Sequence, residues 1–228
     1  MGAILSRCKA WLLGDKTEED AQGPVIVRIR ERGPGIRVFE GLDGDTLSGT
    51  GSALAEMEVE QDAAYWEVHI LALPAGARCC MGVARQNIPL DAPLVSERAA
   101  PPGNSSDMDV FSLEPTAVGA PAEPDGFEQG DGGVEGQLAW ALSSTGGALQ
   151  EGDVVGVAFG QASLPNLRFM RNGEHTGAGT VTRVRGSVHP AFSVSGGASL
   201  SVVFDPDGFR HQVPRGFAEL RPSTSLLD

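Results

Sequence analysis

Apolar side chains in this chain recur at every second residue in one short run after another. The clearest run, residues 65–70, places Trp66, Val68 and Ile70 on one face and polar side chains on the other. Nowhere does the helical spacing of 3.6 residues persist for three turns. Because 31 glycines and 15 prolines among 228 residues separate the runs, the pattern predicts an all-β chain of short antiparallel strands.

Similar runs follow along the chain. The predicted strands lie at residues 25–30, 36–39, 65–70, 79–84, 138–142, 153–159, 166–171, 188–194 and 200–204. Residues 41–51 carry four glycines and are expected to form a loop. Asn172-Gly173 is a strong hairpin signal, and the whole pattern predicts a β-sandwich.

One stretch, residues 91–136, differs in composition from the rest of the chain. It carries ten acidic residues and one basic residue, so it holds −9 of the chain's formal charge of −13. This composition predicts a disordered or loosely held acidic loop inserted into a single domain. The expected organisation is a tail at 1–23, one domain at 24–220 that contains the loop, and a second tail at 221–228.

Charge and cysteine content exclude several classes of protein. An acidic surface repels phosphate, so nucleic acid is not an expected partner. The three cysteines, Cys8, Cys79 and Cys80, suit neither a disulfide framework nor a zinc site, which favours a reducing compartment. No run of 18 apolar residues and no secretory signal occurs, so we expect no transmembrane helix.

Five motifs stand in an order that resembles the SPRY domain family. They occupy residues 65–70, 81–84, 151–157, 166–173 and 188–192. Three further segments, 49–51, 185–190 and 214–217, are similar to the SPRY domain-containing protein 7 group, whose members are little more than one such domain behind a short tail. The resemblance implies a bent antiparallel sandwich with a concanavalin-like jelly-roll topology that binds protein partners and has no catalytic activity.

The resemblance also implies that partners contact loops at one edge of the sandwich, where rigid strand ends present them. We expect contacts from the loop 85–90 and from the turn 195–197. The predicted contact residues are Arg85, Gln86, Asn87, Ile88, Ser195 and Gly196. Some peptide-binding SPRY domains carry an aromatic residue in the turn that is Ser-Gly-Gly-Ala here, so their peptide specificity is not implied for this chain.

The first eight residues fit a pattern for lipid attachment. Gly2 becomes the amino terminus once the initiator methionine is removed, and Ser6 stands where N-myristoylation requires it. Cys8 lies between two basic residues and is a candidate for palmitoylation, which would convert marginal membrane binding into stable anchoring. The pattern predicts a protein held at the cytosolic face of a membrane by acyl groups on Gly2 and Cys8; the alternative is an unmodified terminus.

No combination of residues predicts catalysis, a cofactor or a metal site. The four histidines have no metal-ligand spacing; they are His69, His175, His189 and His211. Nucleophile motifs are absent, and Cys79 and Cys80 are expected to be buried strand residues.

The function that these patterns favour is a monomeric, non-catalytic adaptor in the cytoplasm. We expect it to be peripheral on a membrane, and the ciliary or flagellar membrane is one candidate. One alternative is a lectin-like, carbohydrate-binding sandwich. That reading needs exposed aromatic residues, whereas Trp66 and Trp140 stand in expected core strands. The other alternative is a structural component of a ciliary or other membrane-associated assembly.

Overall fold

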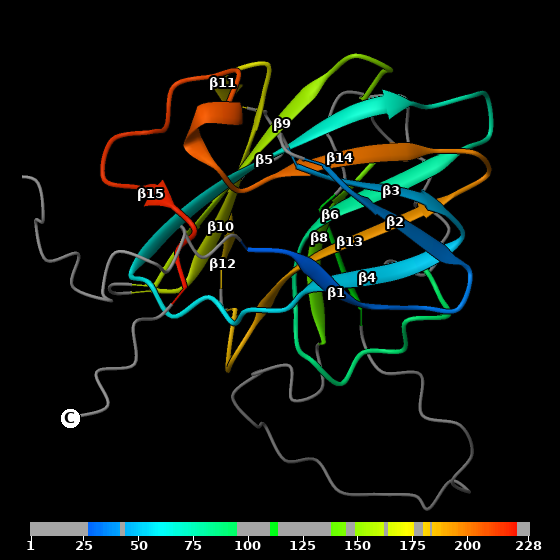
Figure 1. Cartoon of the computed structure of the whole chain (residues 1–228). Coiled ribbons are helices and arrows are strands. Elements are labelled where there is room, and N and C mark those ends of the chain that lie inside the picture. Colours follow the sequence, from blue (N-terminus) through cyan, green and yellow to red (C-terminus); the bar gives the residue numbers. More distant parts are fainter. Residues whose placement is uncertain are drawn as a thin grey trace, which may run out of the picture.

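The structure, a computed structural model, consists of two β-sheets packed face to face (Figure 1). The residues that it describes are 27–41, 44–94, 110–113, 138–144, 149–161, 164–175, 180–182 and 184–222. Among them there is no α-helix, and the helical element is one 3-10 turn, Pro206–Gly208. The predicted all-β sandwich is therefore confirmed.

The first sheet has six antiparallel strands. In order across the sheet they are β1 (Ile29–Arg32), β4 (Gly51–Ala55), β13 (His189–Ser195), β6 (Arg78–Ala84), β8 (Ala139–Ser143) and β7 (Val110–Leu113). We refer to it as the six-stranded sheet.

The second sheet has nine strands. Seven of them follow in the order β11 (Glu174–His175), β10 (Asn166–Arg171), β9 (Val154–Gly160), β5 (Ala63–Ala72), β14 (Ser199–Val203), β3 (Asp45–Gly49) and β2 (Ile36–Glu40). Two short strands lie off this path, β12 (Val181–Thr182) beside β10 and β15 (Ala218–Glu219) parallel to β5.

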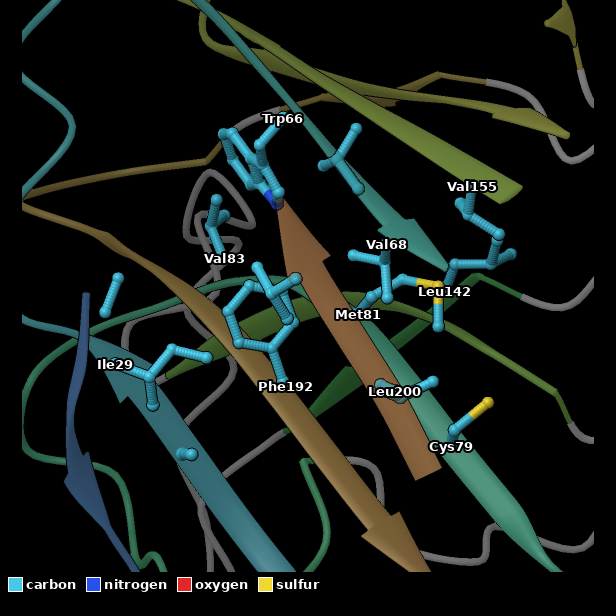
Figure 2. Close-up of a cluster of buried hydrophobic side chains, with 14 of the residues drawn as sticks. Ile29, Trp66, Val68, Cys79, Met81, Val83, Leu142, Val155, Phe192 and Leu200 are labelled. Carbon is cyan, nitrogen blue, oxygen red and sulfur yellow. The ribbon is translucent and has the colours of Figure 1, made fainter. Parts of the chain in front are cut away.

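The core lies between the sheets, where the alternating apolar side chains of both inner faces meet (Figure 2). Trp66 of β5 and Phe192 of β13 are fully buried there. Burial of each large apolar side chain contributes on the order of 2–3 kcal/mol to folding. The sequence pattern assigned the inner face of β5 correctly, since Val68 and Ile70 also point into this core.

Both outer faces are partly covered by irregular chain. Phe209, Val213 and Phe217 of the segment 204–220 pack on Tyr65 of the nine-stranded sheet. Residues 88–94 cover the outer face of the six-stranded sheet, where Ile88 and Leu94 join a second apolar cluster. Side chains on the outer faces are therefore buried too, including Glu67, which the alternation alone places on a polar face.

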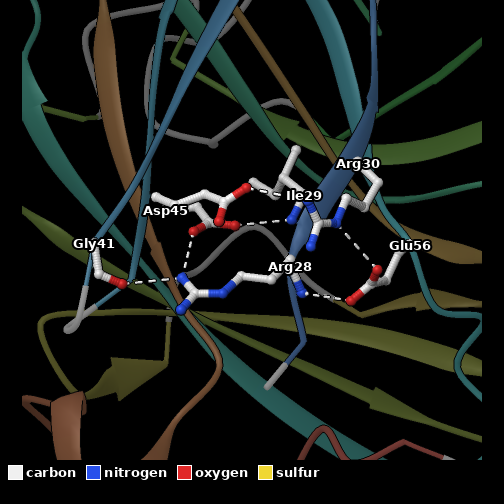
Figure 3. A network of polar contacts seen from close by, with 7 residues as sticks. Arg28, Ile29, Arg30, Gly41, Asp45 and Glu56 are labelled. Carbon is white, nitrogen blue, oxygen red and sulfur yellow. Dashed lines mark hydrogen bonds and ion pairs between the residues drawn. The ribbon is translucent and has the colours of Figure 1, made fainter. Parts of the chain in front are cut away.

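An ion-pair network connects β1 to the other sheet along one side of the sandwich (Figure 3). Arg28 Nη1 lies 2.7 Å from Asp45 Oδ1 and 2.9 Å from the carbonyl oxygen of Gly41. The second carboxylate oxygen of Asp45 accepts the backbone N–H of Ile29 at 2.8 Å. Because Asp45 is 1% exposed, these bonds are screened little by water, unlike the exposed pairs that Arg30 makes nearby.

One sequence-based expectation about a loop is corrected. Residues 41–51, expected as a loop, contain β3, whose Leu47 is fully buried. Gly49 and Gly51 have φ angles of 109° and 131°, which favour glycine. These glycines let the chain pass from β3 in one sheet to β4 in the other, and they do not indicate a long loop.

The acidic stretch 91–136, expected as a disordered or loosely held loop, contains one short strand. Its residues 110–113 form β7 and pair antiparallel with β8, and Leu94 near its start is buried. Residues 95–109 and 114–136 of this stretch, the tail 1–23 with Gly2 and Cys8, and residues 223–228 lie outside the described residues.

Strand pairing defines two ends of the sandwich. We name one of them the turn end, and it consists of residues 33–35, 49–51, 73–77 and 195–198. These four connections join β1 to β2, β3 to β4, β5 to β6 and β13 to β14. The strands they join stand in the order β1, β4, β13, β6 in one sheet and β2, β3, β14, β5 in the other. The four turns therefore lie side by side.

Candidate partner-binding site

The two sequence-predicted contact regions begin at opposite ends of the sandwich. The loop 85–90 then runs back, so that the carbonyl oxygen of its last residue, Leu90, accepts the backbone N–H of Ser52 near the turn end at 2.9 Å. Ser195 pairs with Arg78 at the start of β6, whereas Arg85 follows Ala84, the last residue of the same strand. β6 has seven residues, so at about 3.3 Å per residue Arg85 and Ser195 are roughly 23 Å apart. The structure therefore separates Arg85 from the turn 195–197, whereas the sequence led us to expect both at one edge.

The loop that begins at Arg85 is held closely to the body of the domain. The Arg85 backbone N–H donates to the carbonyl oxygen of Leu138 at 2.8 Å, and its Nε donates to the carbonyl oxygen of Arg185 at 3.3 Å. Gln86 Nε2 donates to Glu31 Oε1 at 2.9 Å. These bonds fix the loop as a well-ordered part of the surface.

Only part of this loop can reach a partner. Gln86 and Asn87 are exposed and Arg85 is half-buried. Ile88, a predicted contact residue, is 6% exposed and belongs to the apolar cluster under residues 88–94. Its side chain therefore anchors the loop, and Ile88 does not offer a contact surface to a partner.

The turn end presents a surface that is poor in side chains. Gly196 and Gly197 are exposed and have φ angles of 66° and 91°, which favour glycine. A Cβ on Gly196 would lie 2.9 Å from the Cα of Ala77, so the two neighbouring turns are in direct contact. Ser195, also predicted as a contact residue, is half-buried beside them.

The other turns of this end extend the surface on both sides. Pro74 and Ala75 are exposed in the turn between β5 and β6, and Pro34 and Thr50 are exposed in the turns before β2 and β4. These positions are neighbours because of the order of the strands in the two sheets. The local sequence pattern does not give that order, because the paired strands are distant from one another in the chain.

A buried polar cluster lies on the outer face of the nine-stranded sheet. Tyr65 Oη donates to Glu67 Oε1 at 3.0 Å, and His69 Nε2 lies 3.0 Å from Glu67 Oε2. The backbone N–H groups of Arg210 and His211 donate to the same carboxylate at 2.7 and 3.0 Å. Glu67 therefore accepts four hydrogen bonds.

The protonation states of this cluster follow from burial and hydrogen bonding. Burial by itself raises the pKa of Glu67, but the bonds from His69, from the two backbone N–H groups and from Tyr65 outweigh it, so the pKa is lowered. Burial, with the neighbouring carboxylate, raises the pKa of Tyr65. Since Glu67 is fully buried and its oxygens are all occupied, this cluster holds the segment 204–220 in place and offers no reacting atom to a substrate.

The two described cysteines are buried strand residues, as expected from the sequence. Burial raises the pKa of the Cys79 thiol to about 12 and also raises the pKa of the Cys80 thiol. Both therefore remain protonated and unreactive at neutral pH. The structure resolves no group of three metal-ligating side chains in the described ranges, and no described helix is long and apolar enough to cross a membrane.

The comparisons with known proteins relate to the same sandwich. The SPRY domain family model matches residues 63–207, which is more than half of the chain. No curated protein matches the chain. Solved structures similar to it include the SPRY domain of human HERC1, which is 14% identical with a TM-score of 0.44 and covers 77% of this chain and 96% of that one.

Two further solved structures are also similar. A TRIM65 PSpry domain is 9% identical with a TM-score of 0.44, over 90% of this chain and 99% of that one. A human SPRY domain is 15% identical with a TM-score of 0.39, over 74% of this chain and 96% of that one. On the family model, which accounts for β5 through the last core strand and its following turn, the chain belongs to the SPRY domain family.

Proposed function

We propose that this protein is a non-catalytic adaptor that binds a protein partner at the turn end and is held at the cytosolic face of a membrane by acyl groups on Gly2 and Cys8. SPRY domains are protein-interaction modules. The observation that carries the partner site is the row of four exposed turns, which the two packed sheets hold side by side. Rigid strand ends of this kind place contact residues with little loss of conformational entropy on binding.

A comparison of the two ends favours the turn end over the loop 85–90. The turn end offers four adjacent connections, and Pro34, Pro74 and Ala75 project from them. The loop 85–90 offers three exposed side chains, Gln86, Asn87 and Pro89, and the buried Ile88 interrupts them. A larger continuous surface supports a more stable interface, so we assign the partner to the turn end.

The membrane attachment rests on the sequence pattern around Gly2 and Cys8, together with the place where the tail joins the domain. Ile29 of β1 pairs with Ala55, so β1 begins at the end of the sandwich opposite the turn end. A tether that joins the domain there leaves the turn end free to face the cytosol. Confinement to a membrane also raises the local concentration of the adaptor, so that a weak contact suffices.

Several finer features belong to this proposal. The chain is a monomer and a member of the SPRY domain-containing protein 7 group, and a ciliary or flagellar membrane is one place where it acts. The lectin-like alternative loses support, because Tyr65, Trp66 and Trp140 are buried and form no aromatic platform for a sugar. A structural role in a membrane-associated assembly is the remaining alternative. Fractionation with detergent separates it from a lipid-held adaptor, because detergent releases a protein that is held by acyl groups alone.

Proximity labelling in native cells tests the partner site with a matched pair of variants. Ala75→Tyr adds neutral bulk at the turn end, and Asn87→Tyr adds the same bulk to the loop 85–90; both positions are exposed. We expect Ala75→Tyr to lose the labelled partner and Asn87→Tyr to keep it. The reverse result would assign the partner to the loop 85–90, and retention by both variants would reject both sites.

The anchor is tested separately with Gly2→Ala and Cys8→Ser. Intact mass of the protein from its own cells is expected to show a fourteen-carbon acyl group on Gly2. Each variant is expected to shift from the membrane fraction to the soluble fraction when cells are fractionated without detergent. A wild-type protein that lacks the acyl group, or that fractionates like Gly2→Ala, would reject the anchor without affecting the partner site.

A further inference from the structure

We propose that β2 accepts an extended segment of the protein partner as an added antiparallel strand, with an apolar side chain of that segment on Phe39 and a carboxylate on Arg37. This inference rests on the proposed function, because β2 continues directly from the turn 33–35 of the turn end. It names the mode of recognition and the chemistry of the partner segment, which the four turns do not specify.

The backbone of β2 is paired on one side only. β2 ends the strand order of the nine-stranded sheet and pairs with β3, and no strand that the structure describes pairs with its other side. The hydrogen bonds at the two ends of this pair are both 3.0 Å long and use odd-numbered residues of the segment 35–41; they run from the N–H of Gly41 to the carbonyl oxygen of Gly44 and from the N–H of Thr50 to the carbonyl oxygen of Gly35. Successive residues of an antiparallel strand direct their backbone groups to alternate sides. The N–H and C=O groups of Val38 and Glu40 therefore point away from β3, where an added strand can bond to them.

Other edge strands carry features that discourage an added strand. β1 ends the six-stranded sheet, but its register is shifted by an irregularity and three of its four residues are charged. β11 and β12 have two residues each. β2 has five residues in an unbroken register with β3. Because irregular register, charge and short length are the means by which edge strands avoid further pairing, β2 is better suited to accept a strand than β1, β11 or β12.

The side chains on the outer face of β2 specify the chemistry of the added strand. Phe39 and Arg37 alternate with Ile36 and Val38, which face the core, so both lie on the outer face of the sheet. Phe39 is 60% exposed, the most of any large apolar side chain in the described ranges. Arg37 is exposed and forms no ion pair with a residue that the structure describes. The fold therefore leaves an apolar ring and a positive charge side by side on this edge.

The geometry of antiparallel pairing converts these two side chains into a short motif. A residue of the added strand lies opposite each of them in a pair that exchanges no backbone hydrogen bond, where the Cα atoms are only about 4.5 Å apart. The residue opposite Phe39 comes first, the next residue bonds to the backbone of Val38, and the third lies opposite Arg37. The partner segment therefore carries an apolar residue followed two positions later by Asp or Glu.

Side chains from β1 mark the far end of the added strand. Arg28 Nη1 donates to the carbonyl oxygen of Gly41 at 2.9 Å, just beyond the last residue of β2 (Figure 3). Arg30 pairs with Glu40 at 3.1 Å, and both side chains are exposed. An exposed pair contributes little to stability, so an incoming strand can displace it. The added strand thus extends from the turn 33–35 to Glu40.

Peptide selection tests the chemistry of the partner segment. A phage-displayed library of random peptides of about twelve residues is selected on the immobilised full chain, and the recovered peptides are sequenced. We expect enrichment of an apolar residue followed two positions later by Asp or Glu. Recovery of peptides without this pattern, of peptides with the reversed order, or of none overturns the inference.

Backbone methylation of a recovered peptide tests the added strand itself. N-methylation of the residue between the apolar and the acidic positions removes an N–H that faces β2, and we expect it to weaken binding more than about tenfold. N-methylation of the apolar or the acidic residue removes an N–H that points away from β2, and we expect less than about a threefold change. Similar losses at all three positions would mean that the peptide does not pair with β2.

Matched variants of the protein place the binding on β2. Phe39→Ser is expected to weaken a selected peptide about five- to thirtyfold and Arg37→Glu about three- to tenfold. The controls make the same changes at exposed positions away from β2, Leu164→Ser and Arg168→Glu, and are expected to stay within about twofold of wild type. Circular dichroism and the thermal unfolding midpoint confirm that each variant is folded. Equal losses in the variants and their controls would overturn the inference.

A second copy of this chain is the other occupant that an exposed edge strand can take. Size-exclusion chromatography with light scattering distinguishes it from a partner strand. We expect a monomer for wild type and for Phe39→Ser. A wild-type dimer that Phe39→Ser dissociates would assign the edge to a second copy and would overturn the inference.

The same reagents separate this inference from the proposed function in the proximity-labelling experiment. If Ala75→Tyr loses the cellular partner while Phe39→Ser keeps it, the turn end binds its partner without β2, and only the inference fails. If both variants keep the partner, the proposed site itself is rejected. Loss in Phe39→Ser alone supports the added strand and rejects the turn 73–77 as part of the site. Loss in both, with the partner retained by Leu164→Ser, supports the inference and the proposed site together.

Discussion

Replacement of Glu67 by glutamine is expected to destabilise the domain by about 3–6 kcal/mol. Each carboxylate oxygen accepts two hydrogen bonds, from Tyr65 and His211 on one and from His69 and Arg210 on the other. An amide keeps one oxygen but puts an NH2 group where the other was, so two donors lose their acceptor. Each lost bond to a buried charged group costs about 1.5–3 kcal/mol.

The pH dependence of this loss follows from the direction of the pKa shift. The pKa of Glu67 in the folded protein lies below its ordinary value of 4.5. Its ionised form therefore stabilises the fold fully above about pH 4.5, and the contribution is lost as the pH falls through the lower folded-state pKa. The stability difference between wild type and Glu67→Gln is thus expected to be largest at neutral pH and to shrink below pH 4.5.

Urea denaturation followed by tryptophan fluorescence measures this difference at several pH values. Tyr65→Phe serves as the control, because it removes one donor but leaves the carboxylate, and about 1–2 kcal/mol of loss with the pH step retained is expected. Amide exchange of residues 204–220 is expected to rise in Glu67→Gln. A loss below about 1 kcal/mol, or one that does not change with pH, would refute the role assigned to this carboxylate.

Three other predictions concern the fold. Asp45→Asn is expected to cost about 1–3 kcal/mol in urea denaturation, since the buried carboxylate accepts both a guanidinium and a backbone N–H; a cost near zero would contradict this. Gly196→Ala is expected to lower the free energy of unfolding by about 1–3 kcal/mol and Gly76→Ala by about 1 kcal/mol. Both glycines have positive φ, but an added Cβ meets the neighbouring turn only at Gly196, so equal costs would count against that contact. Cys79 and Cys80 are expected to resist iodoacetamide at pH 8 until the domain is unfolded in urea, and mass spectrometry of the native protein that shows alkylation at either would contradict their burial.

The inner faces of the strands could be predicted from the sequence because alternation is a local property. Trp66, Val68 and Ile70 lie in the core as the pattern indicates. Alternation does not indicate whether the other face of a strand is exposed to water. The outer face of β5 is not exposed, since Glu67 is fully buried under a segment about 140 residues later in the chain. The same limit explains why β7 was missed, since four residues in an acidic stretch become a strand only by pairing with β8.

The partner site shows the same division between local and distant information. The turn 195–197 was predicted as a contact region, and it does lie on an exposed end. The loop that begins at Arg85 has an equally good local sequence signal. It follows the other end of β6, so Arg85 and the turn 195–197 cannot contact one compact partner segment together. The two regions differ in their neighbours. Three further turns lie beside residues 195–198, because the strands that these turns join follow the same order in both sheets. A chain whose strands were ordered differently would disperse these turns. The proposed partner surface is therefore a property of the topology, since no single turn forms it by itself.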